Sequence, residues 1–542
     1  MNMQRYNLNT VCFWLHFLWI FIGFESTCTA VVIRVSNTGY DNSSCLASNA
    51  RTPCKTIKFA LDAVKNSSNT DFIFSIEDQV YYLEERVSIT QTSPDKDIIL
   101  KSNHATGSTI HCMNIFAGFD IGSGLYSANI TRNINFVNLE FENCGPHFAA
   151  TVVIWNSVEI NFTNCVFKHN KQAGICGFDS GVVIDGCHFL NNTPNHQTNS
   201  TSGGGARFFL RNAISLSIII RSSNFTLNSV AMNNSTKFRW PCTNLSICNY
   251  RNHLGGGLLI MFQENASGCR VVIQDAIFSS NSAKFGGGVY FAASSMTSRN
   301  NFSITNSTFL RNMAVEAGGA MFTRWDTASN ITAILKNCTV SENQSKRGAG
   351  INVFFMNNNE NPIDSVLRFD TVLFSNNYGN ASTAIRFMKA LPYAGRVDVI
   401  PELINCTIVG HNIASVAHTN PFTSQRVNVK FKGRNVFARN NGGGAAGFQD
   451  CVLNVHGQLV FTNNTGLNGG AVLLESSQII LYPDSELMFL GNEARGVGGA
   501  ICVWEHIMEE LMQWYNPNCF LTYSEVNLPP SEWKVRVTSG LY

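Results

Sequence analysis

Apolar and polar residues alternate along short segments of the chain, and the same alternating unit returns many times. The clearest example reads FSSNSAKFGGGVYF over residues 278–291, and close variants begin at Phe309, Phe461 and Phe489. Each unit combines a bulky apolar residue, an Asn three positions later, and a Gly pair just beyond. Alternation with a period of two is typical of β-strands. A unit that returns roughly every 20 to 50 residues is typical of a solenoid, a propeller or a repeat array.

Aligning the units on their first apolar residue gives one column, with steps from 22 residues (Phe167 to Phe189) to 53 (Phe225 to Phe278). The full column is Phe167, Phe189, Phe225, Phe278, Phe309, Val340, Phe374, Ile408, Phe437, Phe461 and Phe489. A step of 22 fits one coil of a parallel β-helix but is too short for a propeller blade, which needs about 40 residues. We interpret the step of 53 as two coils or one large loop. The short strands leave no room for helices between them, which excludes βαβ folds.

Stacking of coils explains why these residue types repeat. Equivalent residues of successive coils lie about 4.8 Å apart, so inward Phe side chains form a stack and Asn side chains at a turn form a hydrogen-bonded ladder. Gly supplies a positive φ at the corner. The prediction rests on the repeat residues Phe278, Asn281, Phe309, Asn312, Phe461, Asn464, Phe489 and Asn492.

Two units depart from the pattern. After Phe374 a single Gly follows where other units have a pair. The segment CTIVGHN at 406–412 has one residue too many between its apolar column and its Asn. We therefore expect different turns in these two coils.

The repeats resemble those of known families. The Phe-x-x-Asn and Gly-Gly-Ala-Ile pairing at 489–501 resembles the repeats of chlamydial polymorphic outer-membrane proteins. The overall plan resembles large right-handed β-helix (pectin-lyase-like) surface proteins of animals, and CLASNARTPCKTIKFALDAVKN at 45–66 resembles the usual start of such domains. The resemblance covers roughly residues 31–503. It implies an all-β fold, a single right-handed parallel β-helix (solenoid) with an N-terminal capping helix. It implies little about function, because the superfamily holds lyases, hydrolases, adhesins and passive scaffolds.

The chain divides into four predicted parts. Residues 1–30 are typical of a secretory signal peptide, since Arg5 precedes the apolar run VCFWLHFLWIFIGF and small residues follow it; an uncleaved signal anchor is the alternative. Residues 31–70 are predicted to be a cap whose short helix has Thr52 as N-cap and Pro53 as first residue. Residues 71–503 are predicted to form the β-helix.

Residues 504–542 are predicted to be a C-terminal extension. WKVRVTSGLY alternates like a strand and turns at a Ser-Gly pair, so we interpret it as an incomplete further coil. The alternative is that these residues pack over the final coil. Because this end lacks a polar cap and a membrane anchor, we expect the natural protein to be longer.

The chain has 17 cysteines, and secretion would place them in an oxidising compartment. Cys45 and Cys54 are predicted to form a local disulfide at the entry to the cap helix. Cys242 and Cys248 are a second candidate pair. Cys165 and Cys187 each precede a column Phe by two positions, so they should lie about 5 Å apart on adjacent coils, a spacing that permits a disulfide without requiring one.

Asn-x-Ser/Thr triplets are abundant, which indicates N-glycosylation in a eukaryotic secretory pathway. An Asn-, Ser- and Thr-rich chain also produces such triplets by chance, so we expect only some of them to carry glycan. The candidate acceptors are Asn42, Asn129, Asn244, Asn301, Asn306 and Asn463.

Charge and motifs argue against several functions. Charged residues make up 14% of the chain and the net charge is +2, so nucleic acid is not an expected partner. No later segment is apolar enough to span a bilayer. The Asp-Asp motif of pectinolytic enzymes does not occur, His456-Gly457 stands without it, and Asp179 and Asp185 have no third acid at coil spacing. No catalytic, cofactor-binding or metal-binding residues are therefore predicted, and no cofactor is expected.

These observations favour a secreted or cell-surface, glycosylated β-helix that acts as a non-catalytic binding, adhesion or matrix scaffold module. Its ligand would be an extracellular carbohydrate or protein, bound along the outward faces of the coils. A polysaccharide lyase or glycoside hydrolase is the alternative, and a mechanical spacer within a larger protein is a third reading. Carboxylates that converge with Arg or Lys in one groove would favour the enzyme.

Overall fold

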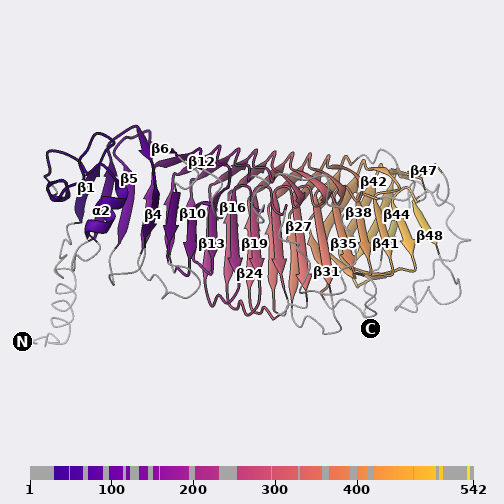
Figure 1. The fold of residues 1–542 in the computed structure, drawn as a ribbon. Coiled ribbons are helices and arrows are strands. Elements are labelled where there is room, and N and C mark those ends of the chain that lie inside the picture. Colours follow the sequence, from indigo (N-terminus) through magenta and orange to yellow (C-terminus); the bar gives the residue numbers. More distant parts are fainter. Residues whose placement is uncertain are drawn as a thin grey trace, which may run out of the picture.

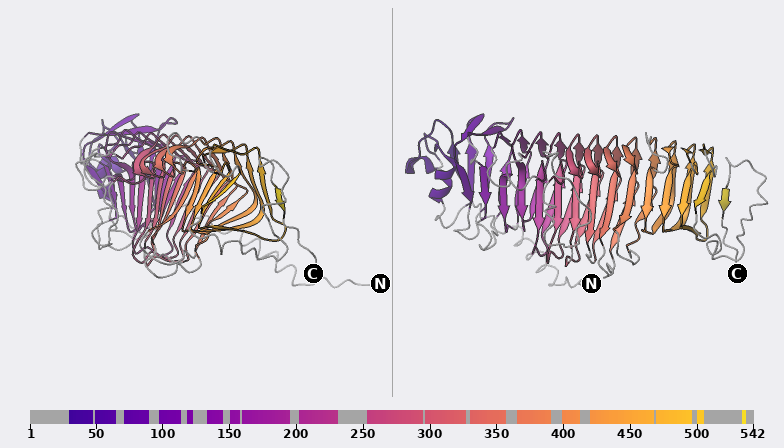
Figure 2. Two further views of the ribbon diagram at one scale, coloured as in Figure 1. Left: turned by 90° about the vertical axis from the view of Figure 1, so that its right-hand side faces the viewer. Right: turned by 45° about the vertical axis from the view of Figure 1, so that its right-hand side comes forward.

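The computed structural model shows an elongated stack of coils, in which short strands line up along one axis (Figure 1). The described residues are 30–504 and 534–536, apart from 48, 65–70, 90–96, 114–117, 123–132, 145–149, 158, 195–201, 231–252, 295, 327–329, 357–364, 391–398, 412–419, 468 and 496–499. Successive coils pair in parallel throughout, and the turned views show the same stack from two further sides (Figure 2). The prediction of an all-β, parallel β-helix solenoid is confirmed.

Each full coil supplies one strand to each of three faces. A sheet of 28 strands holds the first and second faces, and a sheet of 14 strands forms the third. The first face contains β1 (Val31–Val35), β2 (Phe72–Ile76), β5 (Ile98–Ser102), β8 (Ile134–Val137), β11 (Ile160–Thr163), β14 (Val182–Asp185), β17 (Ser217–Arg221), β20 (Arg270–Gln274), β24 (Asn301–Thr305), β28 (Thr332–Lys336), β32 (Val366–Asp370), β36 (Glu402–Ile404), β39 (Val429–Ala438), β42 (Val452–Thr462) and β45 (Gln478–Leu481). The long strands β39 and β42 continue onto the second face.

The second face contains β3 (Val80–Leu83), β6 (Ser108–Cys112), β9 (Leu139–Glu142), β12 (Val166–Lys168), β15 (His188–Leu190), β18 (Asn224–Thr226), β21 (Ile277–Ser279), β25 (Thr308–Leu310), β29 (Thr339–Ser341), β33 (Leu373–Ser375), β37 (Thr407–Val409) and β46 (Glu486–Leu490). The third face contains β4 (Arg86–Ile89), β7 (Gly118–Ile121), β10 (Ala150–Trp155), β13 (Ala173–Phe178), β16 (Ala206–Leu210), β19 (Leu258–Phe262), β23 (Val289–Ala293), β27 (Met321–Asp326), β31 (Ile351–Met356), β35 (Ile385–Lys389), β38 (Phe422–Gln425), β41 (Ala446–Gln449), β44 (Val472–Glu475) and β48 (Ile501–Trp504).

Short corner strands link the second face to the third. They form one sheet of four strands and one of three. The corner strands are β22 (Ser282–Phe285), β26 (Met313–Ala317), β30 (Gln344–Arg347), β34 (Tyr378–Ala381), β40 (Asn441–Gly442), β43 (Thr465–Gly466) and β47 (Glu493–Ala494).

The Phe column is confirmed along its whole predicted length. Phe278 pairs with Phe309 in register, and their buried rings stack with centroids 5.0 Å apart. Phe225 pairs directly with Phe278, so the step of 53 residues is one coil and not two. The column also continues further toward the N-terminus than predicted, through Phe141 and the two coils before it.

The Asn ladder is also confirmed, and it lies inside the coil. Asn281 donates from Nδ2 to Oδ1 of Asn312 at 3.0 Å, and Asn312 donates in the same way to Asn343. Each Oδ1 also accepts the backbone N–H of the Asn below, as at Asn281 N to Asn312 Oδ1, 3.1 Å. All three side chains are fully buried. The ladder therefore satisfies turn amides that would otherwise be buried without a partner.

The corner beyond the ladder needs small residues for two separate reasons. Gly286 has a φ of +65°, whereas a Cβ on Gly287 would lie 2.4 Å from the carbonyl oxygen of Gly319 on the next coil. The first Gly thus supplies the left-handed turn, and the second permits close approach of two backbones.

The expectation of a different turn after Phe374 is corrected. Ser382 occupies the left-handed position with a φ of 54°, so the backbone turn is kept and only the residue changes. Gly379, the single Gly of that unit, lies within strand β34, three residues before the left-handed position. The expectation was wrong because Ser382 fills the position that a Gly, such as Gly348, holds in the neighbouring coil.

The cap helix exists but begins later than predicted. Helix α2 spans Ile57–Val64 and packs beside the first coils at the N-terminal end (Figure 1). Thr56 Oγ1 accepts the N–H of Phe59 at 3.1 Å, so Thr56 takes the capping role assigned to Thr52. Pro53 is outside the helix because the next residue, Cys54, bridges to β1. A 3-10 helix, η1 (Ser43–Leu46), precedes this segment.

Two of the predicted cysteine arrangements lie within the described residues. Cys45 and Cys54 form a disulfide, as predicted. Cys165 and Cys187 occupy one inward column on adjacent coils, also as predicted, but they remain thiols. Cys187 Sγ accepts the N–H of Cys165 at 3.4 Å, the same contact that Ser223 Oγ makes to Cys187 N–H one coil further on. These thiols therefore cap turn amides. Cys242 and Cys248, like the signal peptide, lie outside the described residues.

The second expected irregularity, at 406–412, is also corrected. No residue is inserted, because His411 lies three positions after the column residue Ile408 and takes the ladder position itself. Its N–H donates to Asn440 Oδ1 at 3.2 Å, which continues the ladder on one side. On the other side of the ladder, the imidazole of His411 has no amide oxygen that could accept N–H groups of Asn377. Instead, His411 Nδ1 lies 3.3 Å from the backbone carbonyl oxygen of Asn377.

We expect His411→Asn to stabilise the protein, most clearly in mild acid. Burial lowers the pKa of His411 to about 4, below the value of about 6.5 for an unfolded chain. The unfolded state therefore takes up a proton first, and the wild type should lose up to about 3 kcal/mol as the pH falls from 6.5 to 4. Urea unfolding at pH 7 and pH 4 measures this loss. An equal loss in His411→Asn would contradict the assignment.

The last described strand, β49 (Lys534–Arg536), pairs antiparallel with β46. The predicted strand is therefore present. A further coil of the solenoid would pair in parallel, so the direction favours the alternative in which these residues pack over the final coil. The predicted boundary between the cap and the β-helix, at residues 70 and 71, does not separate two structural units, because β1 of the cap segment pairs with β2 and belongs to the first face.

Candidate functional site

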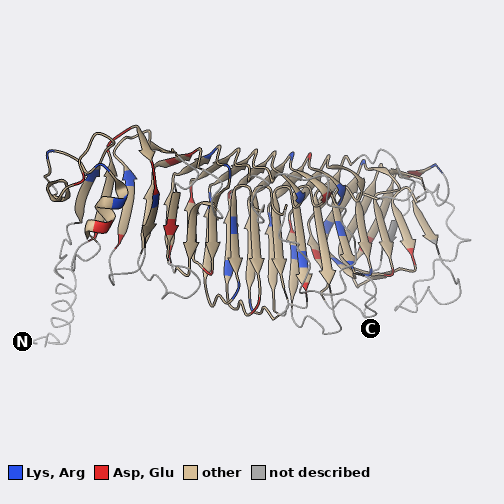
Figure 3. Cartoon of the chain, viewed as in Figure 1, with Lys and Arg blue, Asp and Glu red and all other residues tan. Residues whose placement is uncertain are grey.

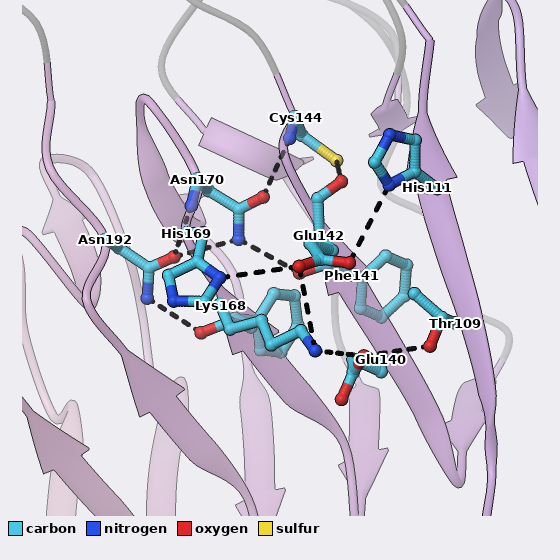
Figure 4. Close-up of polar contacts among 11 residues, drawn as sticks. Thr109, His111, Glu140, Phe141, Glu142, Cys144, Lys168, His169, Asn170 and Asn192 are labelled. Atoms are coloured by element: carbon cyan, nitrogen blue, oxygen red, sulfur yellow. Dashed lines mark hydrogen bonds and ion pairs between the residues drawn. The ribbon is translucent and has the colours of Figure 1, made fainter. Parts of the chain in front are cut away.

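Charged side chains converge on the outer surface of the second face, near the N-terminal end. We call Thr109, His111, Glu140, Glu142, Lys168 and His169 the β9 cluster, after the strand that supplies its two carboxylates. Alternation along β9 turns Glu140 and Glu142 outward while Phe141 joins the buried column. Register then places Thr109 and His111 of β6 on one side and Lys168 of β12 on the other. Figure 4 shows these side chains pointing toward one another.

One ammonium group holds both carboxylates. Lys168 Nζ lies 2.7 Å from Glu140 Oε1 and 3.7 Å from Glu142 Oε1. Two imidazoles flank Glu142, with His169 Nδ1 at 3.4 Å and His111 Nδ1 at 3.7 Å. Thr109 donates to Glu140 at 2.8 Å. The side chains are about a quarter to a half exposed, so ligands in solution can reach the cluster.

These contacts set the charge of the cluster. Partial burial alone would raise the pKa of Glu142, but the hydrogen bond from His169 and the positive charge of Lys168 outweigh it and hold that pKa below its usual value. The hydrogen bond to Glu140 raises the pKa of Lys168. Glu142 and Lys168 are therefore ionised at neutral pH. A general acid needs the opposite, a carboxyl whose pKa is raised.

Carboxyls with a raised pKa occur at three separate places among the described residues. In Asp120, Asp179 and Asp326, burial is the main cause. Asp120 is held by Arg86 and the indole of Trp155, and Asp326 by Arg324. Asp179 lies in the turn after β13, and its Oδ1 atom accepts the backbone N–H groups of Arg211 and Asn212, which follow β16 on the next coil. Each of these acids thus has a local structural contact.

The acids and the histidine considered from sequence do not form a site together. Asp179 follows the third face, whereas Asp185 ends β14 on the first face. His456 stacks on Tyr482 with ring centroids 3.8 Å apart, and partial burial with the nearby Lys430 and Lys432 lowers its pKa. In the part of the chain that the structure describes, no group of three or more His, Cys, Asp or Glu is placed to hold a metal ion.

A stack of aromatic rings on the outer third face is a second candidate for ligand binding. Trp155 and Phe178 stack at 4.2 Å, and Phe178 and Phe209 at 5.3 Å. Because the rings cover one another's faces, mainly their edges point outward. Sugar rings stack on aromatic faces, so this row stabilises the coils more than it offers a binding platform.

The candidate glycosylation sites divide into two groups. Asn42, Asn301, Asn306 and Asn463 are exposed, which leaves room for a glycan. Asn129 and Asn244 lie outside the described residues. The use of each triplet stays a prediction.

The β9 cluster and one disulfide were missed from sequence. Cys112 and Cys144 form a disulfide between adjacent coils. Cys144 lies three residues after Phe141 and its N–H donates to Asn170 Oδ1, so it occupies the ladder position. Phe-x-x-Cys is thus a variant of Phe-x-x-Asn, and including it would have extended the column to β9. Charged residues also lie on other coils (Figure 3). Among them, Glu402 pairs with Arg368 and Lys432, but that group has a single carboxylate.

Comparison with known proteins adds little to this description. No protein-family model matches the chain, and no curated protein sequence matches it. Among solved structures, the chain is similar to that of the Dettilon tailspike protein (gp208), with 10% identity over 87% of this chain and 68% of that chain and a TM-score of 0.27. At that TM-score the likeness carries no argument about function. None of the described helices is long and apolar enough to cross a membrane.

Proposed function

We propose that this protein is a secreted or cell-surface, glycosylated β-helix that binds an extracellular carbohydrate or protein ligand without cleaving it. One observation carries the proposal. Among the described residues, the acids with a raised pKa lie on three different coils, each in a structural contact, while the pKa of Glu142 in the β9 cluster is lowered. Glycoside hydrolysis needs two carboxyl groups with different protonation in one place. This arrangement supports recognition more than chemistry.

Other features agree with an extracellular location. Two disulfides fasten the N-terminal coils, and disulfides persist in oxidising compartments. Four candidate glycosylation sites are exposed. The resemblance to pectin-lyase-like and polymorphic outer-membrane surface proteins is consistent with a role in adhesion or as a matrix scaffold.

A polysaccharide lyase or glycoside hydrolase is the second candidate, and the β9 cluster is the observation that favours it. Glu140 and Glu142 share Lys168, so carboxylates and a cation do converge on one surface. The imidazoles of His111 and His169 also lie beside Glu142. In this reading Glu142 would be essential for activity.

We expect the purified protein to bind a polysaccharide or matrix protein reversibly and to leave the ligand intact. A panel of both kinds, assayed for binding and for new reducing or unsaturated sugar ends, tests this. Glu142→Gln removes the central carboxylate, and Glu159→Gln is the control, because Glu159 is exposed and outside the cluster. Cleavage by the wild type that Glu142→Gln abolishes and Glu159→Gln retains would establish the enzyme instead.

A further inference from the structure

The corner strands and the third face meet at an angle, and the side chains that face each other across it change character along the axis. In the middle coils they are apolar. Phe285 of β22 packs edge-on against Phe322 at 5.3 Å, and Tyr290 stacks on the same ring at 5.4 Å. All three are buried, although they lie on the side of the sheet away from the central core.

Further along the axis the same positions carry polar and cationic groups. Register runs from Phe285 through Ala317 to Arg347 on the corner strands. On the third face it runs from Phe322 to Asn352 and then to Arg386. Arg347, Asn352 and Arg386 therefore occupy the positions that hold the aromatic rings in the earlier coils. We call these three residues the Arg386 site.

Arg386 is in an unusual electrostatic environment for a cation. Burial, together with the positive charge of Arg347, lowers its pKa to about 10. Its one side-chain hydrogen bond within the described part of the chain goes to the thioether of Met388, a weak acceptor, at 2.9 Å. By contrast, Arg86 and Arg324 on the same face each pair with an aspartate. The described residues provide no carboxylate for Arg386 or for Arg347.

An unsatisfied acceptor lies beside this cation. The side chain of Asn352 is 4% exposed, and its Oδ1 atom has no hydrogen-bond partner among the described residues. Arg386 is partly buried, and Asn352 is buried. A partly buried cation without an anion and a buried carbonyl without a donor each destabilise a fold unless something else binds them. The two groups are neighbours in register, so one ligand could satisfy both.

We propose that the Arg386 site binds an acidic saccharide, whose carboxylate or sulfate group pairs with Arg386 and Arg347 and whose hydroxyl donates to Asn352 Oδ1. Arginine suits this role because its planar guanidinium donates two parallel hydrogen bonds to such anions. Non-specific electrostatic attraction between the whole protein and a polyanion would be weak, because the net charge of the chain is only +2. The proposal deepens the proposed function, because it names the chemical class of the ligand.

The test uses the full chain and three size-matched probes. They are a heparin-derived tetrasaccharide with sulfates, an oligogalacturonate with carboxylates alone, and neutral maltotetraose. We expect the wild type to bind at least one acidic probe and Arg386→Met to weaken that binding about 30-fold or more. Arg270→Met, which removes an equal charge from an exposed position on the first face, should change affinity less than about threefold. The two acidic probes distinguish sulfate from carboxylate as the bound group.

Thermal unfolding separates a binding role from a structural one. Without ligand, Arg386→Met should unfold about 1–3 °C above the wild type, because a partly buried charge without a carboxylate partner among the described residues is replaced by an apolar chain. A lower unfolding temperature in Arg386→Met, or equal affinity of the two proteins for the acidic probes, would overturn the proposal. Binding of neutral or protein ligands alone would also overturn it while leaving the proposed function intact.

Discussion

Replacing Asn312 by Asp is expected to unfold the coils around it at neutral pH. Asn312 Nδ2 donates to the Phe278 carbonyl and to Asn343 Oδ1, and its Oδ1 accepts the backbone and side-chain N–H groups of Asn281. A carboxylate would keep the two accepted bonds. It would also place a buried negative charge against two oxygen acceptors, which is far more costly than losing a hydrogen bond.

A pair of variants separates the lost donors from the added charge. Asn312→Ala removes the four hydrogen bonds of the Asn312 side chain and should cost about 3–5 kcal/mol. Asn312→Asp should cost more at pH 7 and less in acid. Burial raises the pKa of a carboxyl, so the introduced Asp would take up a proton in the folded state before it does so unfolded.

Hydrogen exchange and limited proteolysis of residues 278–345 measure the effect locally, which matters in a repeat protein whose coils can open separately. Asn376→Asp is the control, because Asn376 is exposed and has a φ of 50° that Asp also tolerates. Equal protection of the segment in Asn312→Asp and the wild type at neutral pH would show that the ladder does not stabilise the coils.

The parts of the fold that were predictable are those where one coil constrains the next. Phe278 and Phe309 recur in sequence because equivalent residues stack, so spacing alone gave their register. The same reasoning failed where a different residue type occupies an equivalent position in the coil. Ser382 replaces Gly, His411 replaces Asn, and Cys144 replaces Asn at the start of the ladder. A pattern written in residue names does not detect a position defined by φ or by hydrogen bonding.

The candidate sites were less predictable for a related reason. The register of Asn352 and Arg386 follows from their spacing of 34 residues, which equals the step from Val340 to Phe374. Their burial does not, because it depends on the angle between the corner strands and the third face. The β9 cluster lies partly on the coils before Phe167, which the alignment of the Phe column did not include. The periodicity of the sequence predicts which residues are neighbours along the axis. The burial and contacts of each side chain also depend on the shape of the whole coil.

We expect Phe309→Ala to destabilise its coil by about 3–5 kcal/mol, as is usual when a buried Phe is truncated to Ala. Phe309 is fully buried, and its ring stacks on Phe278 below and pairs in register with Val340 above. The cavity would lie inside the column, between Phe278 and Val340, and neighbouring coils cannot close it without losing their own strand pairing.

The control for this variant is Leu310→Ala, one residue further along β25. Leu310 is half-buried and points to the other side of the strand, so its truncation should cost less than about 1 kcal/mol. Secretion yield, protease resistance and chemical unfolding of the two variants provide the comparison. Because side chains alternate sides along a strand, a register error of one residue would exchange the two effects. Wild-type behaviour of Phe309→Ala together with a destabilised Leu310→Ala would therefore contradict the inward column.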